Sequence, residues 1–232
     1  MNMQVSIRGT KTRVPAARRL VDEITCFDLM LATRTRTPFH GEGWRADLKY
    51  DGFRSLAIKR MGQCQLLSRN GHDMSSSFPE VVEAFLAQEG NFVLDGELVV
   101  YDEQVGTSWE RLSRRAVTRS PGSVRKARLR DPSTFVAFDV LAIGTADLRP
   151  ASLEDRRVIL TDLVEEMEGL ALSIVIEADV ASAYHAACDA GLEGIVAKRL
   201  ASSYRAGRTQ DWLKIKNPNY HRRAAVEGFG RR

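Results

Sequence analysis

The chain has 232 residues, a formal net charge of +4, and 44% hydrophobic against 28% charged residues, which suits one large or two small globular domains and excludes a disordered or fibrous protein. No apolar run approaches the roughly 20 residues of a membrane-spanning helix, and the N-terminus lacks an apolar signal core. We therefore expect a cytoplasmic protein with no membrane partner. The three cysteines and four histidines show neither CxxC nor HxxxH spacing, which argues against a disulfide framework, a zinc site and histidine-based catalysis.

The first third of the chain is expected to be mainly strand. Residues 1–28 show weak periodicity, with a short helix predicted over 16–21. From 44 to 68 the alternating pattern predicts an antiparallel meander, with turns at Asp51-Gly52 and Met61-Gly62. An amphipathic helix then begins near Pro79 and ends before Gly90.

The remaining elements alternate without a strict βαβ repeat. Residues 92–101 predict an apolar strand interrupted by Asp95-Gly96-Glu97, Thr107 and Glu110 predict a capping box for a short helix, and residues 120–122 predict a flexible turn. Then follow a strand over 135–143, a helix capped by Ser152 and Asp155 that ends at Gly169, a strand over 172–176, a helix over 181–190, and strands over 194–197 and 212–215. This order predicts an α+β fold with largely antiparallel sheets.

The stretch DLKYDGFR, residues 47–54, contains the candidate nucleophile. Lys49 stands two residues before Asp51-Gly52 inside an alternating apolar pattern. Taken alone, Asp-Gly between apolar runs favours an ordinary hairpin. An unprotonated lysine amine can also attack phosphorus, and neighbouring cations or a divalent metal favour that unprotonated form.

Five further stretches follow in a fixed order: SRNG at 68–71, LDGEL at 94–98, FVAFDVL at 135–141, EGIVAK at 193–198 and WLKIK at 212–216. Together with DLKYDGFR, they resemble the adenylation domain of ATP-dependent DNA ligases. That domain belongs to the covalent nucleotidyltransferase superfamily, which also contains RNA ligases and mRNA capping enzymes. The resemblance covers residues 29–216, and six ordered stretches are far more specific than KxDG alone.

The resemblance implies the ATP-grasp-like nucleotidyltransferase fold of DNA ligases and mRNA capping enzymes, with largely antiparallel sheets flanking an ATP cleft. It divides the chain into an N-terminal segment (1–28), an adenylation domain (29–217) and a basic C-terminal tail (218–232). Ligases normally continue into an OB-fold domain, a small barrel whose last motif orients pyrophosphate. The sequence ends about sixteen residues after Lys216 without one, so we expect a slow or partner-dependent first step.

The first half of the set implies the nucleophile and the nucleotide contacts. By resemblance, Lys49 forms the lysyl-adenylate, Arg54 contacts the nucleotide, and Arg69 reaches the ribose and later the 5′-phosphate of the nick. Phe138 corresponds to the aromatic residue that stacks on adenine, although a core phenylalanine is the ordinary interpretation. Asp47, expected near adenine, stands where ligases commonly carry glutamate and is shorter by one methylene.

The later stretches imply contacts to metal and phosphate. Glu97 and Glu193 are assigned to Mg²⁺ (or Mn²⁺) and ribose, since hard cations prefer carboxylate oxygens; strand-edge glutamates are the alternative. Lys214 and Lys216 alternate with apolar residues, which places both on one face of a strand. The resemblance makes their anion the α-phosphate, with Lys198 in the same pocket; exposed strand lysines remain the alternative.

A basic run between 111 and 130 contains no acidic residue. Such a run is either a solvated face or a contact for nucleic-acid phosphates. The predicted nucleic-acid contacts, besides Arg69, are Arg114, Arg115, Arg119, Arg125, Lys126 and Arg128.

The sequence thus predicts a stand-alone adenylation domain of an ATP-dependent DNA ligase that seals nicks in duplex DNA, in repair or recombination. A separate protein is expected to supply the OB-domain function. Two alternatives stay open: an RNA ligase, and a non-catalytic nucleotide- or nick-binding subunit. A DNA ligase or an RNA ligase would gain covalent AMP from ATP, whereas a non-catalytic subunit would not.

Overall fold

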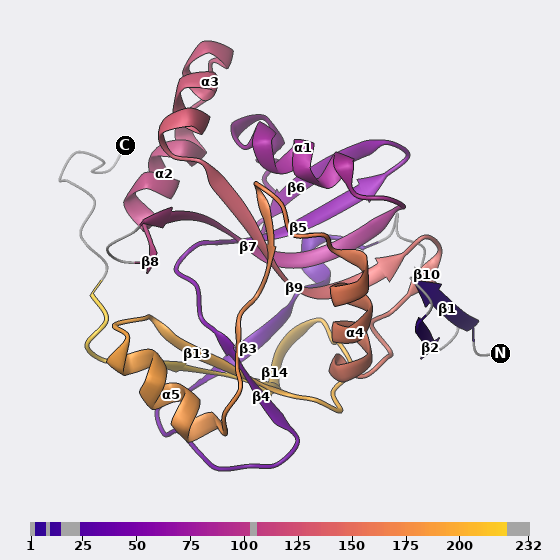
Figure 1. Ribbon diagram of the computed structural model, residues 1–232, viewed down its shortest axis with the longest axis vertical. Helices are drawn as coiled ribbons and strands as arrows, with labels where there is room; N and C mark the ends of the chain where they lie inside the picture. The colour runs from indigo at the N-terminus through magenta and orange to yellow at the C-terminus, as the bar shows by residue number, and fades with distance from the viewer. Residues whose placement is uncertain (1–2, 8–9, 15–23, 103–105, 222–232) are drawn as a thin grey trace.

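The computed structural model describes residues 3–7, 10–14, 24–102 and 106–221, and two sheets dominate it (Figure 1). The larger sheet has seven strands in the order β10 (Ala146–Asp147), β9 (Ser133–Ile143), β7 (Phe92–Asp102), β5 (Phe53–Arg60) and β6 (Gln63–Ser68), with β11 (Leu170–Leu172) beside β9 and β8 (Gly106–Thr107) beside β7. The smaller sheet has the order β12 (Val175–Ile176), β4 (Trp44–Leu48), β13 (Gly194–Arg199), β14 (Gly207–Lys216) and β3 (Met30–Thr35). A separate hairpin joins β1 (Met3–Ile7) and β2 (Thr10–Val14). Only the β11–β9 and β14–β3 pairs are parallel among these described strands, so the α+β prediction is confirmed.

The described ranges contain five α-helices, of which four cover the outer faces of the sheets and one, α3, packs against α2. They are α1 (Pro79–Ala87), α2 (Trp109–Val117), α3 (Pro121–Arg130), α4 (Leu153–Leu163) and α5 (Val180–Asp189), with short 3-10 turns at Cys26–Asp28 and Ser75–Ser77. Apolar residues of α1, α2 and α4 pack on the larger sheet, whereas α5 packs on the smaller one, below it in Figure 1. A third apolar cluster, which includes Met30, Leu56, Leu141 and Trp212, lies between the two sheets.

The loop after β4, residues 49–52, runs from the smaller sheet to the larger one and is called the crossing loop below. The predicted antiparallel meander is wrong at this point. β5 and β6 do form an antiparallel hairpin, but β4 pairs with β12 and β13. Gly52 is needed here for close approach, because a Cβ at this position would lie 2.2 Å from the carbonyl oxygen of Leu98 and 2.8 Å from Cγ of Glu97. The loop that carries Lys49 is thereby pressed against β7.

Three other boundaries differ from the sequence prediction. The strand expected over 172–176 is two short strands, β11 and β12, one in each sheet. Helix α2 is capped by Ser108, and the turn expected at 120–122 is the start of α3, because the Ser120 hydroxyl accepts a hydrogen bond from the Ser123 amide. Helix α4 has the predicted Ser152 cap but ends at Leu163.

The ends of the described chain add little further structure. The helix expected over 16–21 lies outside the described residues. The described residues after β14, 217–221, form a short turn and no OB barrel. Within the described part, no helix is long and apolar enough to cross a bilayer. All three cysteines are free.

Candidate active site

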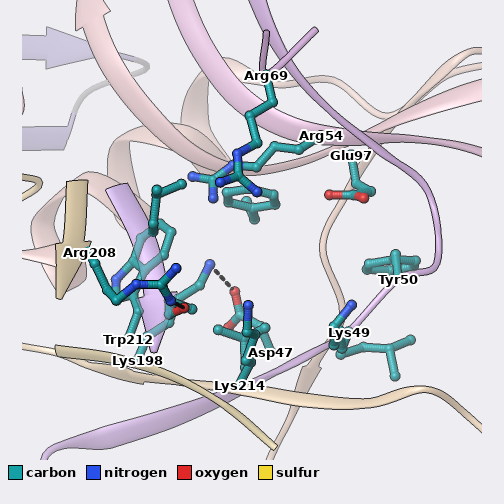
Figure 2. A pocket seen from close by; sticks show the side chains of 15 residues that line it. Asp47, Lys49, Tyr50, Arg54, Arg69, Glu97, Lys198, Arg208, Trp212 and Lys214 are labelled. Atoms are coloured by element: carbon teal, nitrogen blue, oxygen red, sulfur yellow. Dashed lines mark hydrogen bonds and ion pairs between the residues drawn. The ribbon is translucent and has the colours of Figure 1, made fainter. Parts of the chain in front are cut away.

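A cavity of about 210 Å³ lies between the inner faces of the two sheets (Figure 2). The smaller sheet contributes residues of β3, β4, β13 and β14, the larger sheet contributes residues of β5, β7 and β9, and the crossing loop lies at one side. Eight of the predicted site residues line it: Asp47, Lys49, Arg54, Arg69, Glu97, Phe138, Lys198 and Lys214.

Strand alternation explains why lysines of β13 and β14 face this cavity. Ile195, Ala197 and Ile215 pack against α5 on the outer face of the smaller sheet. Because successive side chains of a strand point to opposite faces, Lys198 and Lys214 point inward.

An ion-pair chain holds the candidate nucleophile. Nζ of Lys49 lies 2.6 Å from Oε2 of Glu193, and Oε1 of the same carboxylate lies 2.7 Å from Nζ of Lys216. The Lys49 amide also donates to the carbonyl of Gly194 at 3.0 Å. Glu193 is 4% exposed, so its charge is neutralised by the two lysines rather than by water.

Several cations lie near the Lys49–Glu193–Lys216 ion pairs, at the mouth of the cavity. The pKa of Lys214 is lowered by partial burial and then by the positive charges of its neighbours. These neighbours are Arg208, Lys49, Lys216 and Arg69. An anion placed among them would relieve the repulsion, so this end of the cavity suits a polyphosphate.

The wall of the cavity also contains a buried ion pair, drawn as a dashed line in Figure 2. Nζ of Lys198 lies 2.7 Å from Asp47, and Arg45 makes a bidentate pair with the same carboxylate at 2.7 and 3.0 Å. Burial would raise the pKa of Asp47, but Lys198 and Arg45 lower it below the ordinary value. An adenine contact through Asp47 would have to displace one of these bonds.

Aromatic rings form the wall beside that ion pair. The Lys198 ammonium lies 4.3 Å from the ring centroid of Phe138 and 4.4 Å from that of Trp212. Phe138 is therefore at the cavity surface and outside the closed core, as the stacking prediction requires. Contact with adenine stays a prediction.

The guanidinium of Arg54 lies near the same two rings, but two of its three nitrogens already donate hydrogen bonds. Its guanidinium makes a bidentate pair with Asp95 at 3.0 and 2.6 Å, and the hydroxyl of Tyr204 donates to Asp95 at 2.6 Å. The predicted contact of Arg54 with a nucleotide would therefore have to use the remaining nitrogen or the flat face of the guanidinium.

Glu97 is a carboxylate of the cavity whose pKa is raised. Burial raises its pKa to about 7, although Lys49 and Arg54 act in the opposite direction, and no hydrogen bond from the described residues ties it up. Mg²⁺ typically needs one or two carboxylates together with substrate phosphates. The described residues contain no group of three or more metal-ligating side chains, so Glu97 fits such a shared site better than an all-protein cage.

One predicted nucleic-acid contact is wrong. Arg115 is fully buried on α2 and pairs with Glu80 of α1, over the ring of Phe78. The charge run does not reveal that one of its members faces inward. Arg115 is a core residue and is unavailable to DNA.

The other predicted nucleic-acid contacts of the basic run lie on α2, on α3 and in the turn between them. Arg114 and Arg128 are held by ion pairs with Glu110 and Glu83, at 2.8 and 2.7 Å. Arg119, Arg125 and Lys126 are exposed.

Sequence reasoning did not identify three polar or aromatic residues that line the cavity, Tyr50, Arg208 and Trp212. It also missed Arg45, which pairs with Asp47. Arg45 precedes Asp47 by two residues on the same strand, so alternation could have identified it. Tyr50 accepts a hydrogen bond from the Ile174 amide at 3.1 Å, and burial raises its pKa to about 12. No sequence signal indicated that Arg208, at the start of β14, reaches the cavity.

A lysine amine beside a buried carboxylate, in a cation-rich cleft between two sheets, defines the nucleotidyltransferase class of site. Comparison with known proteins narrows this class. The profile of the ATP dependent DNA ligase domain matches residues 29–216. The chain therefore belongs to this family.

Relatives of known name agree. The chain is 35% identical over 190 residues to the multifunctional non-homologous end joining protein LigD of Pseudomonas aeruginosa, a match that covers 80% of this chain and 21% of that protein. It is 29% identical over 210 residues to DNA ligase C1 of Mycolicibacterium smegmatis, covering 88% and 59%. The chain thus spans only part of each relative.

Solved structures give the same result. The ligase domain of LigD from M. tuberculosis has a TM-score of 0.68 at 28% identity, covering 82% of this chain and 60% of that chain. A mycobacterial DNA ligase D complexed with ATP and MES has a TM-score of 0.67 at 28% identity.

Proposed function

We propose that this chain is the adenylation domain of an ATP-dependent DNA ligase and seals nicks in duplex DNA through a lysyl-AMP intermediate on Lys49. The observation that carries the proposal is the position of the Lys49 amine, bonded to Glu193 at 2.6 Å within the cation-rich mouth of the cavity. A nucleophile and a phosphate-binding environment thereby meet in one place.

In the first step, the Lys49 amine attacks the α-phosphorus of ATP. The nitrogen–phosphorus bond forms, the bond to the β-phosphate oxygen breaks, and pyrophosphate leaves. The amine must lose a proton, and Oε2 of Glu193 is an acceptor already in hydrogen-bond contact. Lys214 and Lys216 then offset the negative charge that develops on the phosphates.

Glu97, with Glu193 nearby, would hold Mg²⁺ in this proposal, since a carboxylate with a raised pKa gains from a cation beside it. The metal would supply charge neutralisation on the phosphates. Phe138 and Trp212 would pack against the base.

The two later steps need DNA at the mouth of the cavity. AMP passes from Lys49 to the 5′-phosphate of the nick, and the 3′-hydroxyl then displaces AMP and closes the strand. In this proposal Arg69, which lines the cavity, would meet the 5′-phosphate, while the exposed cations of α2 and α3 would contact the duplex backbone. The relatives named for non-homologous end joining suggest DNA repair as the setting.

Sealing of a labelled nick tests this function. The protein should join a nicked DNA duplex with ATP and Mg²⁺, and should join it better than a nick whose strands are RNA. Lys49→Ala should abolish joining, whereas Arg205→Ala, at an exposed position in the loop before β14, should retain it. Preference for the RNA nick, or joining by Lys49→Ala, would contradict the proposal.

A further inference from the structure

A short turn after β14 is built onto the loop that precedes β13. The side chain of Asn217 donates to the carbonyl of Leu192 at 3.0 Å and accepts from the amide of Asn219 at 2.9 Å. The Asn217 amide donates to the carbonyl of Glu193 at 3.0 Å. Residues 217–220, called the post-β14 turn below, are therefore fixed to the backbone of the residue that ion-pairs with Lys49.

The same turn also contacts the crossing loop two residues after Lys49. The hydroxyl of Tyr220 donates to Oδ2 of Asp51 at 3.2 Å, and the Tyr220 amide donates to the carbonyl of Asn217 at 3.2 Å. Asp51 is 3% exposed and lies two residues after Lys49. A tyrosine in the turn thus holds the crossing loop directly.

The crossing loop has little freedom of its own. Gly52 is pressed against Leu98 and Glu97 of β7, so the loop can shift only away from the larger sheet. Tyr220 and Glu193 hold it from the side of the smaller sheet. Lys49 is consequently positioned by contacts on both sides, and one set of these depends on the post-β14 turn.

We propose that Tyr220 is a positioning residue for adenylation of Lys49: its bond to Asp51 fixes the crossing loop so that the amine meets the α-phosphorus. The inference deepens the proposed function and rests on it. It predicts that disturbing the post-β14 turn selectively slows the steps that use the Lys49 amine. A displacement of about 1 Å at a reacting group costs up to about a hundredfold in rate, so even a modest relaxation is measurable.

The test separates the steps of the reaction in the Tyr220→Phe variant, which loses only the hydroxyl. Formation of covalent AMP on the protein is followed by intact mass over time with ATP and Mg²⁺. Sealing of a nick that already carries AMP on its 5′-phosphate is followed separately, because that step does not use the amine as a nucleophile. Tyr184→Phe, on the outer helix α5, is the matched control, and thermal unfolding monitors the fold of each variant.

We expect Tyr220→Phe to form lysyl-AMP about tenfold more slowly than wild type, with sealing of the pre-adenylated nick changed less than about twofold. Tyr184→Phe should match wild type in both assays. Asn217→Asp, which keeps the acceptor for Asn219 but loses the donor to Leu192, should reproduce the selective loss.

Other outcomes overturn the inference in distinguishable ways. Equal lysyl-AMP rates for Tyr220→Phe and wild type, or equal losses in both assays, remove the positioning role and leave the proposed function intact. Absence of covalent AMP on the wild-type protein overturns the proposed function and this inference together.

Discussion

Two acidic residues of the cavity differ in whether nearby cations balance their negative charge. Asp47 is buried, but Lys198 and Arg45 outweigh the effect of burial and keep its pKa below the ordinary value. Glu97 has cations nearby without a direct bond from the described residues, and burial raises its pKa to about 7. Asp47 is therefore a structural anion, whereas Glu97 carries a charge that costs stability until a cation joins it.

The pH dependence of stability tests this difference. The pKa of Glu97 rises from 4.5 to about 7 on folding, so the folded state binds more protons between these values, and stability falls as pH rises through this window. Glu97→Gln removes the cost. Without nucleotide, the variant should exceed wild type in unfolding free energy at pH 8 by up to about 3 kcal/mol, and should differ little at pH 4.5.

Denaturant unfolding at pH 4.5 and pH 8 measures this difference in unfolding free energy between Glu97→Gln and wild type. Glu177→Gln, at an exposed position, is the control and should follow wild type at both. A constant difference between Glu97→Gln and wild type across this range would show that Glu97 does not titrate there.

At the scale of elements, the crossing loop depends on one close approach. Gly52→Ala would place a Cβ 2.2 Å from a backbone oxygen of β7, which cannot move without disturbing the sheet. The expected loss is about 1–3 kcal/mol of unfolding free energy, together with slower lysyl-AMP formation. Gly122→Ala, in open space on α3, should be neutral or slightly stabilising, and a Gly52→Ala protein as stable as this control would refute the packing argument.

The surface of α2 and α3 gives a second prediction at this scale. Arg125 is exposed, and Arg125→Glu should weaken binding to nicked duplex DNA and reduce the magnitude of the slope of log K against log salt by about 1, as expected for one lost phosphate contact. Arg205→Glu makes the same charge change in the loop before β14 and should leave the slope unchanged. Equal slopes for Arg125→Glu and wild type would remove α3 from the DNA interface.

These elements also show where sequence reasoning succeeds and where it fails. Alternation along β14 correctly predicted that Lys214 points away from the apolar face, because strand geometry is local. The Asp-Gly turn was misinterpreted as a hairpin because pairing partners are a long-range property: β4 pairs with β13, about 150 residues away. The burial of Arg115 was missed for the same reason, since its partner Glu80 lies on another helix.

At the scale of the whole molecule, two sheets with separate outer cores share an apolar cluster and enclose one cavity between them. Apart from Lys49 and Arg69, which lie in loops, the predicted site residues that line the cavity come from β4, β5, β7, β9, β13 and β14, so the site exists only when both sheets are assembled (Figure 1). The ordered sequence stretches contain the eight predicted site residues that line the cavity. The ion pairs that occupy Asp47 and Arg54 could not be predicted, because Lys198 and Asp95 reach them through folding.

Intact mass after incubation with ATP and Mg²⁺, followed by peptide mapping, tests the central claim most directly. The account predicts that the wild-type protein gains the mass of one AMP, that the modified peptide contains Lys49, and that Lys49→Ala gains none while Lys126→Ala still does. A wild-type protein that stays unmodified, or AMP attached to a residue other than Lys49, would contradict it.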